Sequence, residues 1–271
     1  MLKPTLTLSS LLILPFAGTV SAALISGDIA ILGYTDNGAP DSLRIAALAP
    51  LGAGEVLYFT DNGWTSGGSF RGATTTDGDG NENLIMLTIN NPVAAGTVLG
   101  SPVNSADWTW TTTGTIPGTT SGAFANLNLS SSGDQIMAFQ ATSNQPLLNP
   151  ITMLFQVDNT GAFEDATTPG TGLLLPGLTQ GTTAVLLPTS PSFLSGTYGL
   201  NPADPDVSAL QSSGGTKSQW LSVISDPANW VNTPGALTSM NVTPAPVPEP
   251  GTAALAGLAA AALLRRRRQQ A

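Results

Sequence analysis

Short apolar runs, each closed by glycine, proline, asparagine or aspartate, are the feature of this sequence that most restricts its fold. The chain has 271 residues with 30 glycines and 21 prolines, a content that favours frequent turns over long helices. Eight runs predict strands, at residues 28–35, 43–48, 55–60, 84–89, 108–112, 134–140, 151–157 and 183–187. Asp36-Asn37-Gly38 and Asp61-Asn62-Gly63 predict tight turns, because Asn and Gly tolerate a positive φ. The pattern predicts an all-β fold, either an antiparallel β-sandwich or a barrel.

Two segments of the sequence predict a particular element and its orientation. Residues 217–225 have apolar residues at helical spacing, so we expect one short helix near the end of the β region. Residues 151–157 alternate most clearly, with every second residue apolar from Ile151 onward. We therefore expect this strand to bury one face and to turn Thr152 and Gln156 away from the core.

The absence of histidine and cysteine excludes many kinds of site. A chain without either residue cannot form disulfides, thiolate or imidazole metal sites, or Ser-His-Asp triads. Between residues 24 and 248 only Arg44, Arg71 and Lys217 are basic, against sixteen acidic residues. Such an acidic body repels phosphate backbones, so we expect no nucleic-acid partner and favour a soluble extracellular protein.

Residues 1–22 have the composition of a secretory signal peptide. Lys3 makes the start positive, residues 6–16 are mostly apolar, and Val20-Ser21-Ala22 offers small residues for cleavage after Ala22. A first transmembrane helix is the alternative, but a span needs about 20 apolar residues. We expect export through the secretion translocon, with residues 24–240 forming one exported β domain.

The C-terminal end combines a linker, an apolar run and a basic tail. Residues 241–250 are Pro-rich, so we expect an extended linker that does not pair into a sheet. Residues 251–264 are uninterrupted apolar residues, which as a helix would be about 21 Å long, against about 30 Å of bilayer core. The run predicts a single short transmembrane helix. The basic tail after it consists of Arg265, Arg266, Arg267 and Arg268, which should stay cytoplasmic and leave the β domain outside.

The order of these features resembles the PEP-CTERM protein-sorting signal of exported Gram-negative proteins. Val247, Pro248, Glu249 and Pro250 carry the Pro-Glu-Pro motif, and the apolar run and the arginines follow directly. The resemblance implies that an exosortase, a membrane-embedded transpeptidase-like protease, recognises the tail and removes it. It also implies a transient inner-membrane anchor, final placement at the cell surface or in the extracellular matrix, and an association with exopolysaccharide and biofilm.

Three segments of the β region suggest a second resemblance. Residues 27–30, 58–64 and 127–136 are similar to a β-rich domain of bacterial surface proteins that resembles the lamin-tail, immunoglobulin-like sandwich. This resemblance implies a shared fold and no known activity.

One loop has the beginning of a calcium-binding pattern. Asp77, Asp79 and Asn81 place oxygen ligands at alternate positions, but an EF-hand needs Gly and Glu where Glu82 and Thr88 stand. A solvated turn is therefore the preferred interpretation, and we expect no cofactor. A looser calcium site is the weaker alternative.

Catalytic and sugar-binding candidates are few. Glu164 and Asp165 could supply the two carboxylates of a glycosidase, but neighbouring side chains on a strand face opposite ways. Trp108 and Trp110 would share one sheet face and could stack on sugar rings, whereas core filling is the commoner role of tryptophan. We expect no catalytic residue and favour a non-enzymatic structural or binding component. The alternative is an exported carboxylate-dependent hydrolase acting on polysaccharide.

Overall fold

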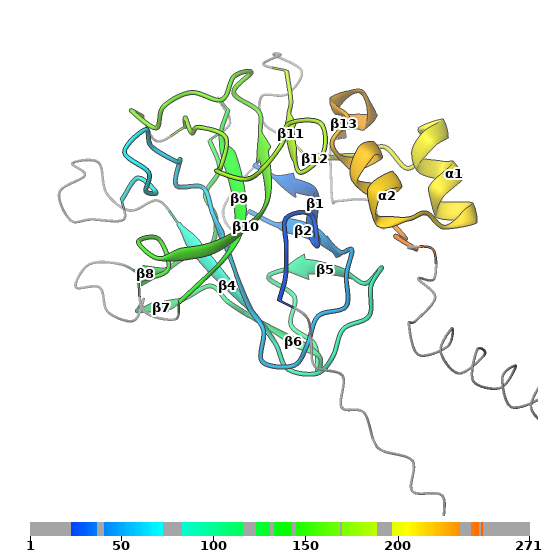
Figure 1. The fold of residues 1–271 in the computed structure, drawn as a ribbon, viewed down its shortest axis with the longest axis horizontal. Helices are drawn as coiled ribbons and strands as arrows, with labels where there is room; N and C mark the ends of the chain where they lie inside the picture. The colour runs from blue at the N-terminus through cyan, green and yellow to red at the C-terminus, as the bar shows by residue number, and fades with distance from the viewer. Residues whose placement is uncertain are drawn as a thin grey trace, which may run out of the picture.

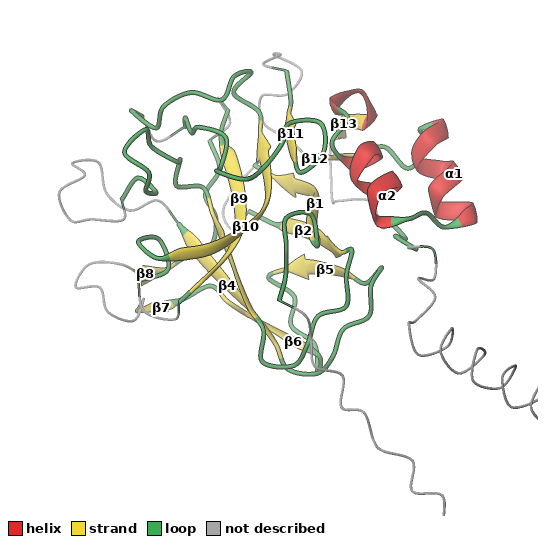
Figure 2. Ribbon diagram, viewed as in Figure 1, coloured by secondary structure: helices red, strands yellow, loops and turns green. Residues whose placement is uncertain are grey.

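Strands dominate the described part of the chain (Figures 1 and 2). The computed structural model describes residues 23–36, 41–72, 83–115, 123–130, 133–142, 145–168, 170–188, 197–233, 240–243 and 245. Each of the eight predicted strands is present, with bounds shifted by at most two residues. The predicted turn at Asp36-Asn37-Gly38 has only its first residue inside the described ranges.

A five-stranded sheet has the order β13–β12–β1–β2–β5, and all its neighbours pair antiparallel. Its strands are β1 (Ile29–Thr35), β2 (Leu43–Ala47), β5 (Val98–Ser101), β12 (Thr197–Leu200) and β13 (Trp230–Thr233). The sequence did not predict β5, β12 or β13. Each has only four residues, and Thr, Gly and Ser occupy several of the positions in β5 and β12, so their apolar signal is weak.

A six-stranded sheet has the order β11–β10–β9–β3–β4–β6. Its strands are β3 (Val56–Thr60), β4 (Leu84–Ile89), β6 (Trp108–Thr111), β9 (Gln135–Ala141), β10 (Pro150–Asp158) and β11 (Ala184–Leu186). All pairs are antiparallel except β10 and β11, which run parallel, so the predicted all-antiparallel arrangement is wrong at this edge. A small separate pair joins β7 (Gly114–Thr115) to β8 (Ala123–Phe124).

The main core contains buried residues from both sheets. Ile31 and Ile45 from the five-stranded sheet and Phe59 and Leu87 from the six-stranded sheet are all inaccessible to solvent and belong to one apolar cluster. Burial of one such side chain contributes about 1.5–3 kcal/mol. The alternating strands of both sheets therefore stabilise the fold through one shared core.

Strand β10 is buried on both faces, which contradicts the expected alternation. Leu154 and Gln156 are fully buried, whereas Ile151 at the start of the strand is 68% exposed. The register with β9 shifts at two places, so a simple alternation of faces is lost. The Gln156 side chain is accommodated because its amide donates to Leu173 O at 3.2 Å and accepts from Leu175 N at 2.9 Å.

Asp61-Asn62-Gly63 is not the tight positive-φ turn that the sequence predicts. Asp61 and Asn62 are buried, and Gly63 does not have a positive φ. A Cβ on Gly63 would lie 1.9 Å from the carbonyl oxygen of Thr171. Glycine is needed here for close backbone approach, which sequence alone does not distinguish from a turn.

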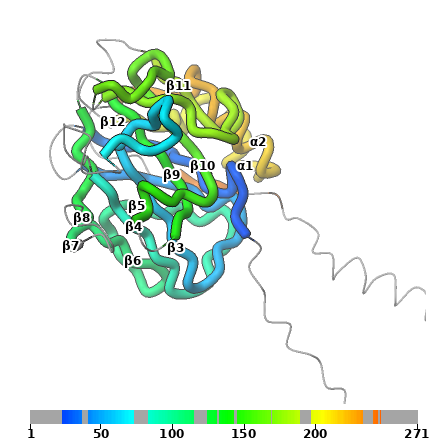
Figure 3. Tube along the Cα trace, turned by 60° about the vertical axis from the view of Figure 1, so that its left-hand side comes forward, coloured from blue at the N-terminus to red at the C-terminus, as the bar shows by residue number. Residues whose placement is uncertain are grey.

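Two helices lie together at one side of the strands, on the side away from β7 and β8 (Figures 1 and 3). Helix α2 (Lys217–Ile224) confirms the predicted helix, and its start carries a capping box between Thr216 and Gln219. Helix α1 (Pro205–Ser213) was not predicted because only one of its residues, Val207, is buried. Asp204 caps it, and a short 3-10 helix η2 (Pro227–Asn229) follows α2.

Within the described ranges, the helices are all too short or too polar to cross a membrane. The predicted signal peptide at residues 1–22 and the predicted membrane helix at 251–264 both lie outside these ranges.

Candidate functional site

The sorting motif follows directly after the last described residue. Val247, Pro248, Glu249, Pro250 and the arginines 265–268 lie outside the described residues, as does the cleavage candidate Ala22. The structure therefore bears on the motif through the segment that leads into it.

Residues 240–243 and 245, which we call the docked segment, are attached to the domain. Met240 and Val242 are 7% and 4% exposed and belong to the main core. Gly215 N donates to Thr243 O at 2.9 Å, Trp220 Nε1 donates to the same oxygen at 3.2 Å, and Ala245 N donates to Gly215 O. The start of the region that we expected to be an unpaired linker is therefore packed and hydrogen-bonded.

Two glycines in the loop between α1 and α2 allow close packing, Gly214 against the docked segment and Gly215 against the two helices. Gly214 has φ +72°, and a Cβ there would lie 3.1 Å from Thr243 O. A Cβ on Gly215 would lie 2.8 Å from a Leu210 methyl group and 3.3 Å from Trp220 Nε1. Gly215 donates its N–H to Thr243 O and accepts from Ala245 N. The loop therefore pairs with the docked segment as one residue of a β-strand would.

The helices are in turn fixed to the start of β1. Lys217 forms an ion pair with Asp28, whose other carboxylate oxygen accepts from Ile25 N at 2.7 Å. Ser225 Oγ donates to Thr182 O at 2.8 Å, just before β11. The α1–α2 loop is therefore held at a defined position relative to both sheets.

Aspartates at the ends of three strands form a second polar region, which we call the aspartate end. Residues 127–130, the strap, cross it with Leu127 and Leu129 buried in the main core. Consecutive backbone amides of the strap donate to different carboxylates: residue 128 to Asp61 at 3.4 Å, 129 to Asp41 at 2.6 Å, and 130 to Asp134 at 2.8 Å. These carboxylates thus join the strap to β2, β3 and β9.

Two carboxyl groups in this region have raised pKa values. Burial raises the pKa of Asp61 to about 7, although amides of Asn128 and Asn83 act in the opposite direction. Burial likewise raises the pKa of Asp158 to about 7, opposed by hydrogen bonds from Thr160 and assisted by the charge of Glu164. Both groups therefore titrate at a much higher pH than an ordinary aspartate.

A stacked tyrosine pair lies close to these carboxylates. The rings of Tyr34 and Tyr198 have centroids 5.0 Å apart and are inclined by 26°. Burial raises the pKa of Tyr34, and the nearby Tyr198, Asp36, Asp134 and Asp158 raise it further. Both tyrosines therefore remain neutral at physiological pH.

Of the two carboxylates suggested by the sequence, Asp165 is engaged by a neighbouring loop. Asp165 accepts hydrogen bonds from Ser66 N at 2.8 Å and Ser66 Oγ at 2.6 Å, which lower its pKa. Its role here is to hold the loop at 65–70. The calcium candidates Asp77, Asp79 and Asn81 lie outside the described residues, and the described residues contain no group of three acidic side chains placed to bind a metal.

The tryptophans fill the core rather than forming a sugar platform. Trp110 is 4% exposed, and Trp108 packs against the same cluster while its Nε1 donates to Val103 O at 3.0 Å. The pair shares one face, as expected, and on that face Trp110 is buried and Trp108 is half-buried. Trp64, Trp220 and Trp230 are also buried.

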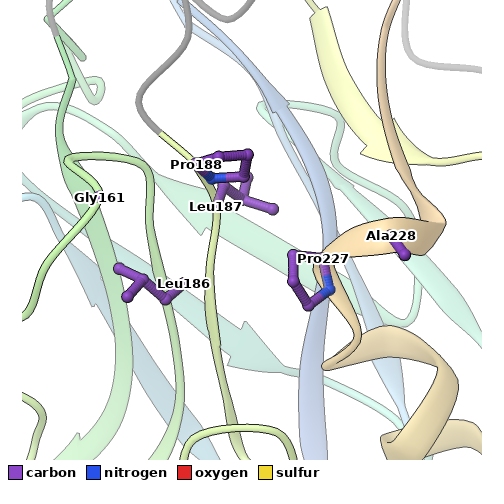
Figure 4. Close-up of a pocket in the computed structure, with 6 residues that line it drawn as sticks. All are labelled: Gly161, Leu186, Leu187, Pro188, Pro227 and Ala228. Carbon is purple, nitrogen blue, oxygen red and sulfur yellow. The ribbon is translucent and has the colours of Figure 1, made fainter.

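One shallow apolar depression opens beside β11, with a volume of about 310 Å³ (Figure 4). Its lining consists of Gly161, Leu186, Leu187, Pro188, Pro227 and Ala228. The lining contains no charged or hydroxyl-bearing side chain that could orient a sugar or activate water. The depression is a shallow apolar gap between the end of β11 and η2.

The comparisons with known proteins identify the C-terminal end of the chain. Residues 246–268 match the PEP-CTERM protein-sorting motif, which confirms the resemblance predicted from the sequence. Searches of curated proteins and of solved structures returned no significant match. The matched motif indicates an exported protein that is targeted by an exosortase. The chain therefore carries a PEP-CTERM protein-sorting motif at its C-terminal end.

Proposed function

We propose that this protein is a non-enzymatic component of the cell surface or extracellular matrix, released from a transient membrane anchor by an exosortase. The observation that carries the proposal is the match of residues 246–268 to the sorting motif. In this proposal the arginines 265–268 stay in the cytoplasm and the β domain lies outside. The secretion translocon and an exopolysaccharide are its other partners.

The use of the carboxylates supports a structural role. Asp41, Asp61 and Asp134 accept backbone amides of the strap, and Asp165 holds a neighbouring loop. A glycosidase would instead need two carboxyl groups facing each other across an open cleft. Buried acceptors that fix backbone segments are suited to holding a β domain together without disulfides.

The fold is part of the same proposal. Two mainly antiparallel sheets that share one core support a sandwich of the immunoglobulin or lamin-tail kind. Many cell-surface domains share this architecture, and by this analogy of fold the domain fits a matrix component.

The test of sorting is a comparison of variants in cells that contain the processing enzyme. Replacing Pro248, Glu249 and Pro250 together by alanine should leave the chain in the membrane fraction, whereas Pro244→Ala should still reach the matrix. Equal arrival of both variants in the matrix would contradict exosortase sorting.

The class of function is tested on the processed protein. We expect it to co-sediment with the matrix polysaccharide of the producing cells without releasing reducing ends. Release of reducing ends, abolished by Asp158→Asn or Asp61→Asn, would instead establish a carboxylate-dependent hydrolase.

A further inference from the structure

The docked segment leaves only a short tether before the sorting motif. Ala245 is held to Gly215, and Pro248 follows three residues later, a distance of at most about 11 Å in extended chain. The apolar run begins at Gly251, within at most about 22 Å of Ala245. A compact domain of about 220 residues has a radius of gyration near 17 Å and hence a diameter of about 45 Å. The tether is thus about half as long as the domain is wide.

This geometry restricts which face of the domain can approach the membrane. If the apolar run is in the bilayer, the point of attachment at Gly215 lies within about 22 Å of it. The α1–α2 loop surrounds that point, whereas β7 and β8 lie on the opposite side of the strands (Figures 1 and 3). Only the side that carries the helices can therefore face the enzyme that cuts the tail.

The α1–α2 loop itself carries little charge. The loop residues 214–216 and the docked segment contain no aspartate or glutamate, whereas the exposed Asp206 lies in the first turn of α1 and the exposed Asp226 follows α2. The cation at the start of α2, Lys217, is paired with Asp28. The acidic residues thus stand at the ends of the two helices opposite the loop, and the loop can approach a membrane enzyme without a negative charge of its own.

We propose that the α1–α2 loop and the docked segment form the face that contacts the membrane-embedded processing enzyme while the tail is still attached. The proposal rests on the proposed function, because it takes the exosortase as the partner. The docked segment fixes both the distance and the direction in which the domain presents the motif. The exposed surface of this face is formed by Ser212, Ser213, Thr216, Ser218 and Gln219.

Site-specific photo-crosslinking of the full chain tests this face. A photoreactive residue at Ser213, which is exposed at the end of α1, should form an adduct with the processing enzyme in cells that contain it. The matched control is Thr113, also exposed, which directly precedes β7 on the opposite side. Equal enzyme adducts from both positions, or adducts of Ser213 with lipid alone, would overturn the proposal.

A spacer variant tests the role of the short tether. Twelve Gly and Ser residues inserted between Ala245 and Pro246 lengthen the path to Gly251 threefold and lower the effective concentration of the face at the membrane about fivefold. The Ser213 adduct should fall by a similar factor, and an unchanged yield would contradict the tether argument.

Intact mass of the same chains separates this proposal from the proposed function. If the arginine tail is removed normally but the adducts do not discriminate between Ser213 and Thr113, only the presenting face is wrong. If the tail is retained in every variant, the sorting function itself fails.

Discussion

The aspartate end and the docked end of this domain are held by different physical means. At the aspartate end, carboxylates of Asp41, Asp61 and Asp134 accept amides of the strap, and two nearby carboxyl groups titrate near neutral pH. At the docked end, Val242 and Trp220 are buried in the core, and the hydrogen bonds that Gly215 and Trp220 make with the docked segment join neutral groups. One end should therefore respond to pH and the other should not.

The two kinds of attachment serve two different purposes in one exported chain. Buried carboxylates hold the strap across the ends of the strands, which makes this end of the domain dependent on proton concentration. Apolar packing and neutral hydrogen bonds attach the chain that leads to the sorting motif, so we expect this attachment to be independent of pH. Substitutions at each end can establish whether this division is real.

The largest effect is expected from Trp220→Ala at the docked end. Trp220 is fully buried, and its Nε1 bonds Thr243 O, so the variant should lose about 3–5 kcal/mol of unfolding free energy. Urea unfolding at pH 5 and at pH 8 should give the same loss. A loss confined to one pH would mean that the docked end is coupled to the titrating carboxyl groups.

The pH dependence of stability is expected to come from the aspartate end. Burial raises the folded-state pKa of Asp61 and of Asp158 from 3.8 to about 7, so the folded state binds more protons than the unfolded state between these values. The unfolding free energy should therefore be highest near pH 4, fall as the pH rises to 7, and then level off. One carboxyl group contributes up to about 4 kcal/mol to this fall.

Asp61→Asn provides the control for this prediction. The amide cannot ionise, so the variant should show a shallower fall between pH 4 and pH 7 in the same unfolding series. A stability that rises over this range in the unsubstituted protein would contradict the assignment of the buried charge.

A smaller effect is expected from Val242→Ser, which loosens the docked segment alone. Val242 is 4% exposed, so the change should lose about 2 kcal/mol and increase cleavage of the segment in limited proteolysis. Val103→Ser is the matched control, since Val103 is 66% exposed and the change should cost less than about 0.5 kcal/mol. Equal proteolysis of the two variants would mean that the docked segment is not attached to the domain in solution.

The smallest effect concerns the glycine that the docked segment crosses. Gly214→Ala and Gly181→Ala both place alanine at a positive φ, +72° and +77°, which costs about 1–3 kcal/mol, and ψ of 160° puts Gly214 in a region that is essentially restricted to glycine. Only the Gly214 variant also crowds Thr243 O, so its melting temperature should be the lower of the two. Equal melting temperatures would indicate that the segment can move away without loss.

The sequence patterns predicted where the strands lie more accurately than they predicted which residues contact one another. Long apolar runs such as β1 and β4 are visible because their signal repeats over several residues, whereas β12 and β13 have only four residues each. The buried Gln156 was wrongly expected to face outward, because its hydrogen bonds come from residues 173 and 175, which are distant from it in the sequence.

The candidate site was predicted only where its residues are neighbours in the sequence. The sorting motif, apolar run and arginines follow one another in the sequence, so their order alone identified them. Docking of residues 240–243 and 245 depends on a loop 25 to 30 residues earlier in the chain, and the only local hints were Met240, Val242 and the Gly214-Gly215 pair. The strap has a similar origin, since its amides meet aspartates from three separate strands.

The central claim, that the tail is cut from a domain held close to the motif, is tested most directly by the intact mass of protein recovered from the cell surface. We expect a mature form without residues 1–22 and without Arg265–Arg268 that retains the docked segment through Ala245. Recovery of surface protein that still carries the four arginines would contradict the claim and would leave a simple membrane anchor in its place.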